Sequence, residues 1–325
     1  MIEKKYEVVI ACGGAGKRLR EITKNIPKPL FLVENKSTLE RCIEQLDFYN
    51  FERIVITTEY KSKIFEEFVV SLNKKYKIFI DIFIEEKPLG ECGALWTIKE
   101  ELCNNFIFIN GDLIFSIDFR KLIAFHKRLS SNLTLVTHTS DHPEDSDLIS
   151  AANGTLIDQI FVKSAQINID RNAYLGNSGI FVLNKNILNI IDSPKKDDSK
   201  SVFHFIVKKI FDLKKNIYSY NTTEYIKDMG TPKRIKIVED DLRTNKVNLR
   251  NYVNKQRALF LDRDNTLIKC EIGQYIISKE EINFIDTYIK KISLISKDYD
   301  FVCLVTNQPI ISMGILSIKK LDSIN

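Results

Sequence analysis

Apolar runs of strand length alternate with amphipathic stretches along the first 140 residues, and this alternation constrains the fold most. Strand-like runs are found at Tyr6–Ala11, 53–57, 77–84, 106–109 and 133–137. Stretches with apolar residues at helical spacing separate them, and one of these begins with the capping-box pair Ser37 and Glu40. Strands separated by helices of this length indicate a mostly parallel sheet that is covered on both faces. We therefore predict an α/β fold with a Rossmann-like sheet, mixed but mostly parallel.

A second unit is expected towards the C-terminus. The chain has 325 residues, which at roughly 100–200 residues per domain favours two domains. A polar stretch at 241–255 is followed by a fresh apolar strand at 258–261 and a further strand at 301–305. The predicted organisation is a first domain at 1–245, a linker at 246–256 and a second α/β unit at 257–325.

Composition excludes several classes of protein. The net charge is only +5, and no basic stripe marks a nucleic-acid-binding face. No apolar run approaches the ~18 residues of a membrane span, and the residues before Tyr6 do not resemble a signal peptide. The six cysteines contain no C-x-x-C pair, so we interpret them as buried free thiols in a reducing cytosol. A cytoplasmic protein without nucleic-acid or membrane partners is expected, and oligomerisation is left open.

A glycine-rich segment, Cys12-Gly-Gly-Ala-Gly-Lys-Arg18, directly follows the first strand. Glycines allow the backbone to bend tightly, and its N–H groups can then cradle phosphate oxygens. Lys17 and Arg18 would add cationic donors. The spacing matches neither a P-loop nor the dinucleotide-binding fingerprint. A phosphate site and a plain turn between a strand and a loop are both consistent with this segment alone.

Two further segments carry candidate charges. Lys28 lies between Pro27 and Pro29, which would hold it as a pre-placed positive charge, although an ordinary turn explains the pattern as well. Asp112 follows the strand at 106–109. Ligands of open parallel sheets bind beyond the carboxyl ends of strands, so Asp112 and the glycine-rich segment are expected to share one crevice. An aspartate at that position could hold Mg²⁺.

Six motifs, in this order, resemble the sugar-phosphate nucleotidyltransferases. They are Gly13-Gly-Ala-Gly-Lys-Arg-Leu19, Pro27-Lys-Pro-Leu30, Pro88-Leu-Gly-Glu-Cys-Gly-Ala94, Gly111-Asp112, Asn177-Ser-Gly179 and Asp228-Met-Gly-Thr-Pro232. The resemblance implies a Mg²⁺-dependent enzyme that transfers a nucleoside monophosphate from a nucleoside triphosphate to a sugar 1-phosphate and releases pyrophosphate. Such catalysis works mainly by positioning and charge neutralisation.

The resemblance also assigns roles by motif position. Catalytic contacts to the triphosphate and the attacking phosphate fall to Arg18 and Lys28, and Mg²⁺ would be held by Asp112 and Asp228. The residues expected along the nucleotide are Gly13, Gly14, Gly16, Lys17, Gly90 and Gly93. The residues expected at the sugar phosphate are Lys163, Asn177 and Gly179.

The chain departs from the family pattern at three places. Lys17 stands where Thr or Ser is usual, and Glu91-Cys92 replaces a Thr-Ala or Thr-Gly pair. Val162 precedes Lys163 where the family often has a glutamate that binds sugar hydroxyls. This last departure weighs against ordinary hexose recognition but leaves the phosphate chemistry intact.

The second unit begins with an apolar strand that ends in Asp262-Arg-Asp264-Asn-Thr266. Two carboxylates flanking one residue at a strand end allow Asp262 to attack phosphorus while Asp264 transfers protons. The segment resembles haloacid-dehalogenase-type phosphatases, and Asn307-Gln308 resembles their histidinol-phosphate and heptose-bisphosphate branch. Residues 257–325 contain neither the later lysine nor the later acidic pair of that family, so we expect a C-terminally truncated unit without phosphatase turnover.

The leading hypothesis joins both resemblances. A heptose-bisphosphate phosphatase yields heptose 1-phosphate, so the fusion favours GTP and D-glycero-D-manno-heptose 1-phosphate as substrates, for surface polysaccharide synthesis. A cytidylyltransferase acting on another sugar or polyol phosphate is the alternative within the family. A non-catalytic module that binds sugar nucleotides, and a phosphatase served by its N-terminal part, are the alternatives from other classes.

Overall fold

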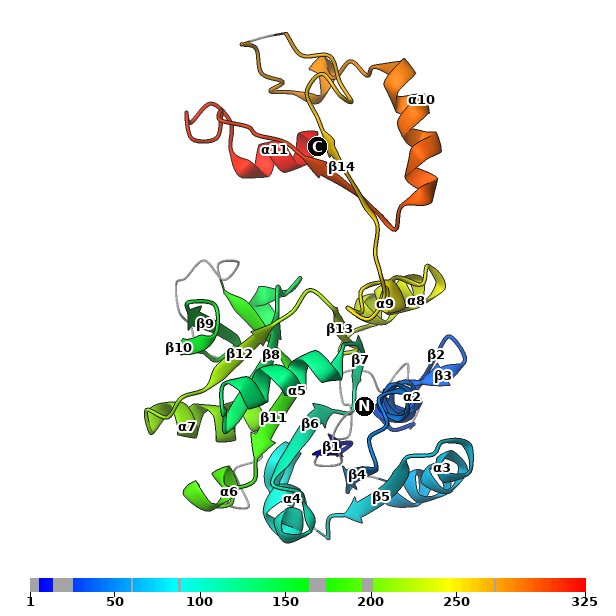
Figure 1. Ribbon diagram of the computed structural model, residues 1–325, viewed down its shortest axis with the longest axis vertical. Helices are drawn as coiled ribbons and strands as arrows, with labels where there is room; N and C mark the ends of the chain where they lie inside the picture. The colour runs from blue at the N-terminus through cyan, green and yellow to red at the C-terminus, as the bar shows by residue number, and fades with distance from the viewer. Residues whose placement is uncertain are drawn as a thin grey trace. The chain divides into compact units, whose positions relative to one another are not determined.

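The computed structural model of the chain describes residues 6–13, 26–59, 61–86, 89–163, 174–194, 201–271 and 273–325. The chain forms two compact units, and the boundary between them lies between Val253 and Asn254 (Figure 1). Within the described residues, no helix is long and apolar enough to cross a membrane. All six cysteines lie in this part of the chain and are free thiols, and Cys12, Cys42 and Cys92 are buried.

One half of the large sheet in the first unit is parallel. The described residues form nine strands in this sheet. In spatial order, the parallel half consists of β5 (Phe79–Ile84), β4 (Arg53–Thr58), β1 (Tyr6–Ala11) and β6 (Asn105–Asn110). The helices that follow β4 and β5 are α3 (Ser62–Lys75) and α4 (Gly90–Ile98). Here the alternation of strands and helices builds the parallel arrangement that the sequence predicts.

The other half of the sheet is mostly antiparallel. It contains β11 (Leu175–Asn184), β8 (Leu133–His138), β12 (Tyr218–Asn221), β10 (Leu156–Phe161) and β9 (Leu148–Ala152). Among these described strands, only β8 and β12 pair in parallel. The hairpin of β9 and β10 turns at Asn153 and Gly154, which adopt φ of 51° and 72°. A short turn joins antiparallel strands directly, without a crossover helix. The sheet is therefore mixed, with its parallel part confined to the first half.

Helices cover both faces of the sheet. Val8 and Ile10 point to one face, where they pack with α2 (Thr38–Phe48) and α5 (Phe119–Arg128), and Val9 points to the other face. On that second face lie α4, a π-helix (η6, Phe203–Val207) and α7 (Lys208–Asp212). Because successive strand residues point in opposite directions, β1 is buried on both sides.

A two-stranded ladder forms beside the large sheet. Its strands are β7 (Leu113–Ser116) and β13 (Tyr225–Asp228), which pair antiparallel. Two helices, α8 (Pro232–Arg243) and α9 (Lys246–Leu249), pack against the ladder around Val247 and Tyr225. Asn251 is also buried, where it bonds the Ser116 hydroxyl at 3.2 Å. Much of the stretch predicted as a linker at 246–256 thus packs on the first unit, and the two units divide after Val253.

The second unit is small. Its strands β14 (Ala258–Asp262) and β15 (Phe301–Val305) pair in parallel, and its helices are α10 (Asp286–Ile295) and α11 (Ile318–Ile324). The buried apolar residues described in it are Ile268, Ile276, Ile310, Leu316 and Ile324. None of them lies on the two strands, whose side chains are exposed or half-exposed.

Candidate active site

The parallel strands β1 and β6 end close together at one edge of the sheet. Ala11 pairs with Asn110, and the Gly111 N–H donates to the Ala11 carbonyl at 2.9 Å. A Cβ atom at Gly111 would lie 2.7 Å from both the Ala11 oxygen and Cys12 Sγ. Only glycine fits this close approach, which brings Asp112 beside the start of the glycine-rich segment.

The ladder of β7 and β13 brings the two predicted metal ligands together. Asp228 lies opposite Leu113, and the Met229 N–H donates to the Asp112 carbonyl at 3.3 Å. The side chains of Asp112 and Asp228 are 31% and 27% exposed, so both carboxylates border solvent. The structure thus places two acidic residues, separated by more than a hundred positions, on neighbouring backbones.

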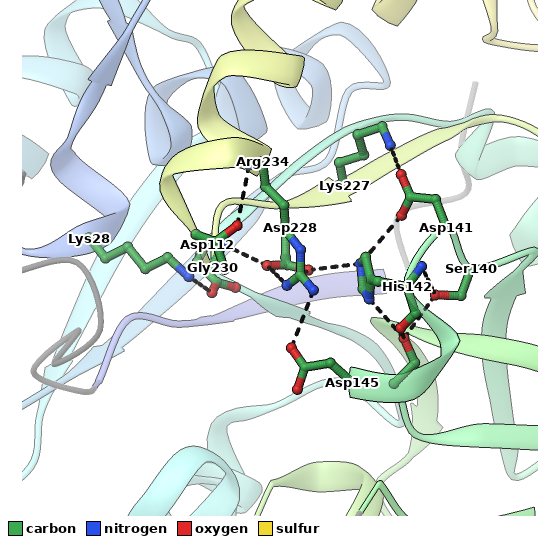
Figure 2. A network of polar contacts seen from close by, with 12 residues as sticks. Lys28, Asp112, Ser140, Asp141, His142, Asp145, Lys227, Asp228, Gly230 and Arg234 are labelled. Carbon is green, nitrogen blue, oxygen red and sulfur yellow. Dashed lines mark hydrogen bonds and ion pairs between the residues drawn. The ribbon is translucent and has the colours of Figure 1, made fainter. Parts of the chain in front are cut away.

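Each carboxylate is paired with a cation in this structure (Figure 2). Lys28 forms an ion pair with Asp112, and a short 3₁₀ turn (η2, Lys28–Leu30) directly after Pro27 positions it. Arg234 donates to both oxygens of Asp228, at 2.9 and 3.0 Å. Burial would raise the pKa of Asp228, but the Arg234 and Lys28 charges lower it below its ordinary value. Asp228 is therefore ionised at neutral pH.

The local structure explains why Gly, Thr and Pro follow Asp228 in the Asp-Met-Gly-Thr-Pro motif. Thr231 caps α8 by accepting from the Arg234 N–H at 3.3 Å, and Pro232 occupies the first helical turn. The Gly230 N–H donates to Asp228 Oδ1 at 2.6 Å. A Cβ atom at Gly230 would lie 2.5 Å from that oxygen and 3.0 Å from the Arg234 guanidinium. The motif therefore orients Asp228 and delivers Arg234 to it.

The loop at 141–147, between β8 and β9, completes the cluster. His142 Nε2 lies 3.5 Å from both Asp228 Oδ2 and Asp141 Oδ1, and Lys227 pairs with Asp141 (Figure 2). Asp145 accepts from Arg234 at 3.2 Å. The run of acidic residues at 141–147 was visible in the sequence, but no motif linked it to Asp228. Arg234 was missed as well.

The predicted sugar-facing residues of β11 lie next to the carboxyl end of β6. Gly179 has φ +82°, and a Cβ atom there would lie 2.9 Å from Asn110 Nδ2. The Gly179 N–H donates to Asn177 Oδ1 at 3.2 Å, within an irregular part of the pairing between β11 and β8. The third predicted residue, Lys163, follows β10, and its N–H donates to Asp147 at 2.9 Å.

The family profile described as nucleotidyl transferase matches residues 7–245. The chain belongs to the nucleotidyl transferase family. The six motifs predicted this membership, and the profile confirms it. The matched region carries Lys28, Asp112, Asp228 and Arg234.

Similar proteins include guanyltransferases. A mannose-1-phosphate guanyltransferase of Yarrowia lipolytica is 29% identical over 229 residues, which cover 69% of this chain and 61% of the relative. This chain thus spans under two thirds of the length of that relative. The crystal structure of HddC from Yersinia pseudotuberculosis is 25% identical, with a TM-score of 0.61 over 73% of this chain and 99% of that one. The same protein complexed with GMP-PN gives a TM-score of 0.59, the same identity and the same coverage.

Members of the nucleotidyl transferase family are expected to use Mg²⁺, and the two carboxylates suit it. The described residues contain no group of three or more histidines, cysteines or acidic residues that could hold a metal. Mg²⁺ is commonly bound through one or two carboxylates together with substrate phosphates. Asp112 and Asp228 therefore fit a metal that arrives with a nucleotide, and they do not form a closed protein cage.

The predicted nucleotide-binding residues are only partly described. Gly14, Gly16, Lys17 and Arg18 lie outside the described residues, and their roles stay predictions. Gly13 has open space around its Cβ position, so packing does not demand glycine there.

The glycines of the second predicted nucleotide loop lie at the start of α4. Gly90 has φ +75°, which favours glycine at this position. A Cβ atom at Gly93 would collide with the Leu89 side chain. The backbone conformation and packing therefore account for glycine at both positions. Their contacts with a nucleotide stay predictions.

The second unit presents its own acidic residues at a strand end. Asp262 pairs with Val305 in the parallel ladder, so Asp262 and Thr306 leave the strands at one edge. Gln308 Nε2 donates to Asp264 at 2.7 Å and to the Thr306 hydroxyl at 2.8 Å. The profile match ends before this unit, so its resemblance to phosphatases and the roles of Asp262 and Asp264 stay predictions.

Proposed function

We propose that the first unit transfers a nucleoside monophosphate from a nucleoside triphosphate to a sugar 1-phosphate. An oxygen of the sugar phosphate attacks the α-phosphorus, a new P–O bond forms, and the bond to the β-phosphate breaks so that pyrophosphate leaves. The observation that carries the proposal is the pairing of β7 with β13, which gathers Asp112, Asp228, Lys28 and Arg234 at one sheet edge.

The residues of the cluster suit this chemistry because the substrates are polyanions. When bound, Mg²⁺ would neutralise charge on the triphosphate between Asp112 and Asp228. Lys28 would exchange its partner Asp112 for a phosphate oxygen and stabilise charge there. Arg234 would keep Asp228 ionised and oriented. No side chain needs to form a covalent bond, since alignment and charge neutralisation can provide the rate enhancement.

We further propose GTP as the nucleotide. The support is the similarity to a guanyltransferase and to HddC, which was crystallised in complex with GMP-PN. For the acceptor we propose D-glycero-D-manno-heptose 1-phosphate, because Val162 replaces a usual sugar-binding glutamate and because the second unit resembles heptose-bisphosphate phosphatases. Mannose 1-phosphate is the second candidate, because the Yarrowia relative is a mannose-1-phosphate guanyltransferase. The free thiols support our proposal of a cytoplasmic location.

The test is a matrix of four nucleoside triphosphates against several sugar 1-phosphates, with pyrophosphate release as the measurement. We expect turnover with GTP, and faster turnover with the heptose than with the mannose 1-phosphate. Turnover with CTP alone would make the protein a cytidylyltransferase. Tight nucleotide binding without pyrophosphate release from any pair would contradict transfer and favour a binding module.

A further inference from the structure

One carboxylate connects the segments predicted to face the sugar. Asp147 lies directly before β9, and its Oδ1 accepts from the Lys163 N–H at 2.9 Å. Its carbonyl oxygen accepts from the Asn177 N–H at 2.9 Å. The same Oδ1 accepts from His204 Nε2 at 2.8 Å, and Asp147 is only 11% exposed. Asp147 therefore brings His204 to the side of the site where Lys163 and Asn177 lie.

The segment that carries His204 is unusual. Residues Phe203–Val207 form a π-helix. Such helices are rare in proteins overall, and those that occur are often found at functional sites. The N–H of Val202, at the start of this turn, donates to Glu91 Oε1 on α4 at 3.1 Å. Two carboxylates from distant parts of the chain, Asp147 and Glu91, thus hold the π-helix in place.

Glu91 also links this segment to the acidic cluster. The pKa of Glu91 is raised to about 7, chiefly by burial, and among the smaller causes the charge of Asp112 raises it while the charge of His204 lowers it. One carboxyl group is therefore within electrostatic reach of both Asp112 and His204. Glu91 therefore couples the His204 side electrostatically to the predicted metal-binding side.

His204 is suited to bind an anion. Its hydrogen bond to Asp147 raises the pKa of His204 above its ordinary value, which favours the imidazolium form. The side chain is 25% exposed, and among the described residues Nδ1 has no hydrogen-bond partner. One N–H is therefore fixed by Asp147, and the other is available as a charged donor.

We propose that His204 binds the phosphate of the acceptor sugar 1-phosphate, with Asp147 as its positioning residue, an inference that rests on the proposed function. The imidazolium donates from Nδ1 to a phosphate oxygen, beside Lys163, and no bond is made or broken. Sequence reasoning did not find this residue, because no motif contains it.

The experiment measures steady-state kinetics with the full chain, varying each substrate in turn. His204→Gln should raise the KM for the sugar 1-phosphate about 10- to 100-fold, as expected for a hydrogen bond to a charged group, and leave the KM for the nucleotide unchanged. Asp147→Asn should raise the same KM by a smaller factor. Lys208→Gln is the matched control, because Lys208 is exposed on the adjoining helix α7 and pairs there with Asp212. Each variant must keep the wild-type Tm, and His204→Asn serves as a second variant.

The outcomes separate this inference from the proposed function. An unchanged acceptor KM in both His204 variants, with an active wild type, overturns the role of His204 and leaves nucleotidyl transfer standing. A loss confined to some sugars of the panel points to a hydroxyl contact and overturns the phosphate assignment. A wild type that releases no pyrophosphate and binds no sugar 1-phosphate by calorimetry overturns both.

Discussion

Both units contain the same sequence pattern, an apolar strand followed by an acidic residue. The two units differ in how deeply that strand is buried. In the first unit, β6 is buried at Phe106 and Ile109 with no exposed surface, and Asp112 follows it. In the second unit, Phe260 of β14 is 68% exposed, and Val302 of β15 is 51% exposed. A strand packed on both faces fixes its end residues, whereas a two-stranded sheet gives them less rigid support.

The surroundings of the carboxylates differ as well. Asp228 is held by Arg234, six residues further along the chain, and lies beside Asp112, which comes from a distant segment of the first unit. Asp264 is held by its direct neighbour Arg263 and by Gln308. The comparison teaches that a strand-end carboxylate needs rigid support and a cluster of partner charges, which Asp228 and Lys28 provide for Asp112. Transfer chemistry should therefore depend on the first unit alone.

The largest expected effect is on Asp112. Asp112→Asn keeps the shape of the side chain but removes the charge that would hold Mg²⁺, so kcat should fall about 10²- to 10³-fold. Pyrophosphate release at saturating Mg²⁺ measures this loss. Asp212→Asn, at the exposed end of α7, is the matched control and should retain full activity. Near-normal turnover of Asp112→Asn would remove this residue from the metal site.

A smaller loss is expected for Lys28. Lys28→Met removes the cation that pairs with Asp112, and kcat/KM should fall about 10- to 100-fold, the range for a hydrogen bond to a charged group. Lys36→Met is the control, since Lys36 pairs with Glu44 away from this cluster. Lys17→Met should lose far less than Lys28→Met. Equal losses would mean that the phosphate-contacting lysine is misassigned.

Acid should destabilise the first unit selectively. Burial lowers the pKa of His126 and of His138 to about 4, so both stay neutral when folded, while the unfolded chain takes up protons below about pH 6.5. Stability is therefore lost as the pH falls, by about 2 kcal/mol per histidine between pH 7 and 5. Urea unfolding at pH 7 and pH 5 measures the free energy of unfolding at each pH. His126→Gln should reduce the difference between the two values. The second unit contains no histidine, so its unfolding should not show this dependence.

The smallest expected difference concerns local stability. Amides of β14 and β15 should exchange with solvent faster than those of β1 and β6, by at least about tenfold in protection, because few apolar residues are buried around the second pair. Native-state hydrogen exchange followed by mass spectrometry compares the two strand pairs within one molecule. Equal protection would show that the exposed faces of β14 and β15 cost the second unit no stability.

Local signals predicted the fold well. The helix start predicted at Ser37 is confirmed, since Ser37 Oγ accepts from the Glu40 N–H at 3.1 Å at the start of α2. The strands of the parallel half were predicted close to their observed bounds, because each contains a short apolar run, and β1, β4 and β6 bury side chains on both faces. The strands of the antiparallel half were harder to predict from the sequence, although Asn153-Gly154 is a dipeptide typical of β-hairpin turns.

The convergence of the site was harder to predict. The ladder of β7 and β13 joins segments more than a hundred residues apart, and each strand is too short to give a clear pattern. Motif resemblance assigned Asp112 and Asp228 to one Mg²⁺ site, and the ladder shows how the backbone makes them neighbours. Asn251 illustrates the same limit, because a polar residue in a polar stretch is typical of a linker, and only the fold supplies its buried partners Tyr49 and Ser116.

The most direct test compares the two strand-end carboxylates in one assay. Asp228→Asn and Asp262→Asn make the same chemical change in the first and the second unit. Pyrophosphate release from GTP and the preferred sugar 1-phosphate should fall about 10²- to 10³-fold in Asp228→Asn and stay at the wild-type rate in Asp262→Asn. Wild-type activity of Asp228→Asn, or an equal loss in both variants, would contradict a transferase site built by the first unit alone.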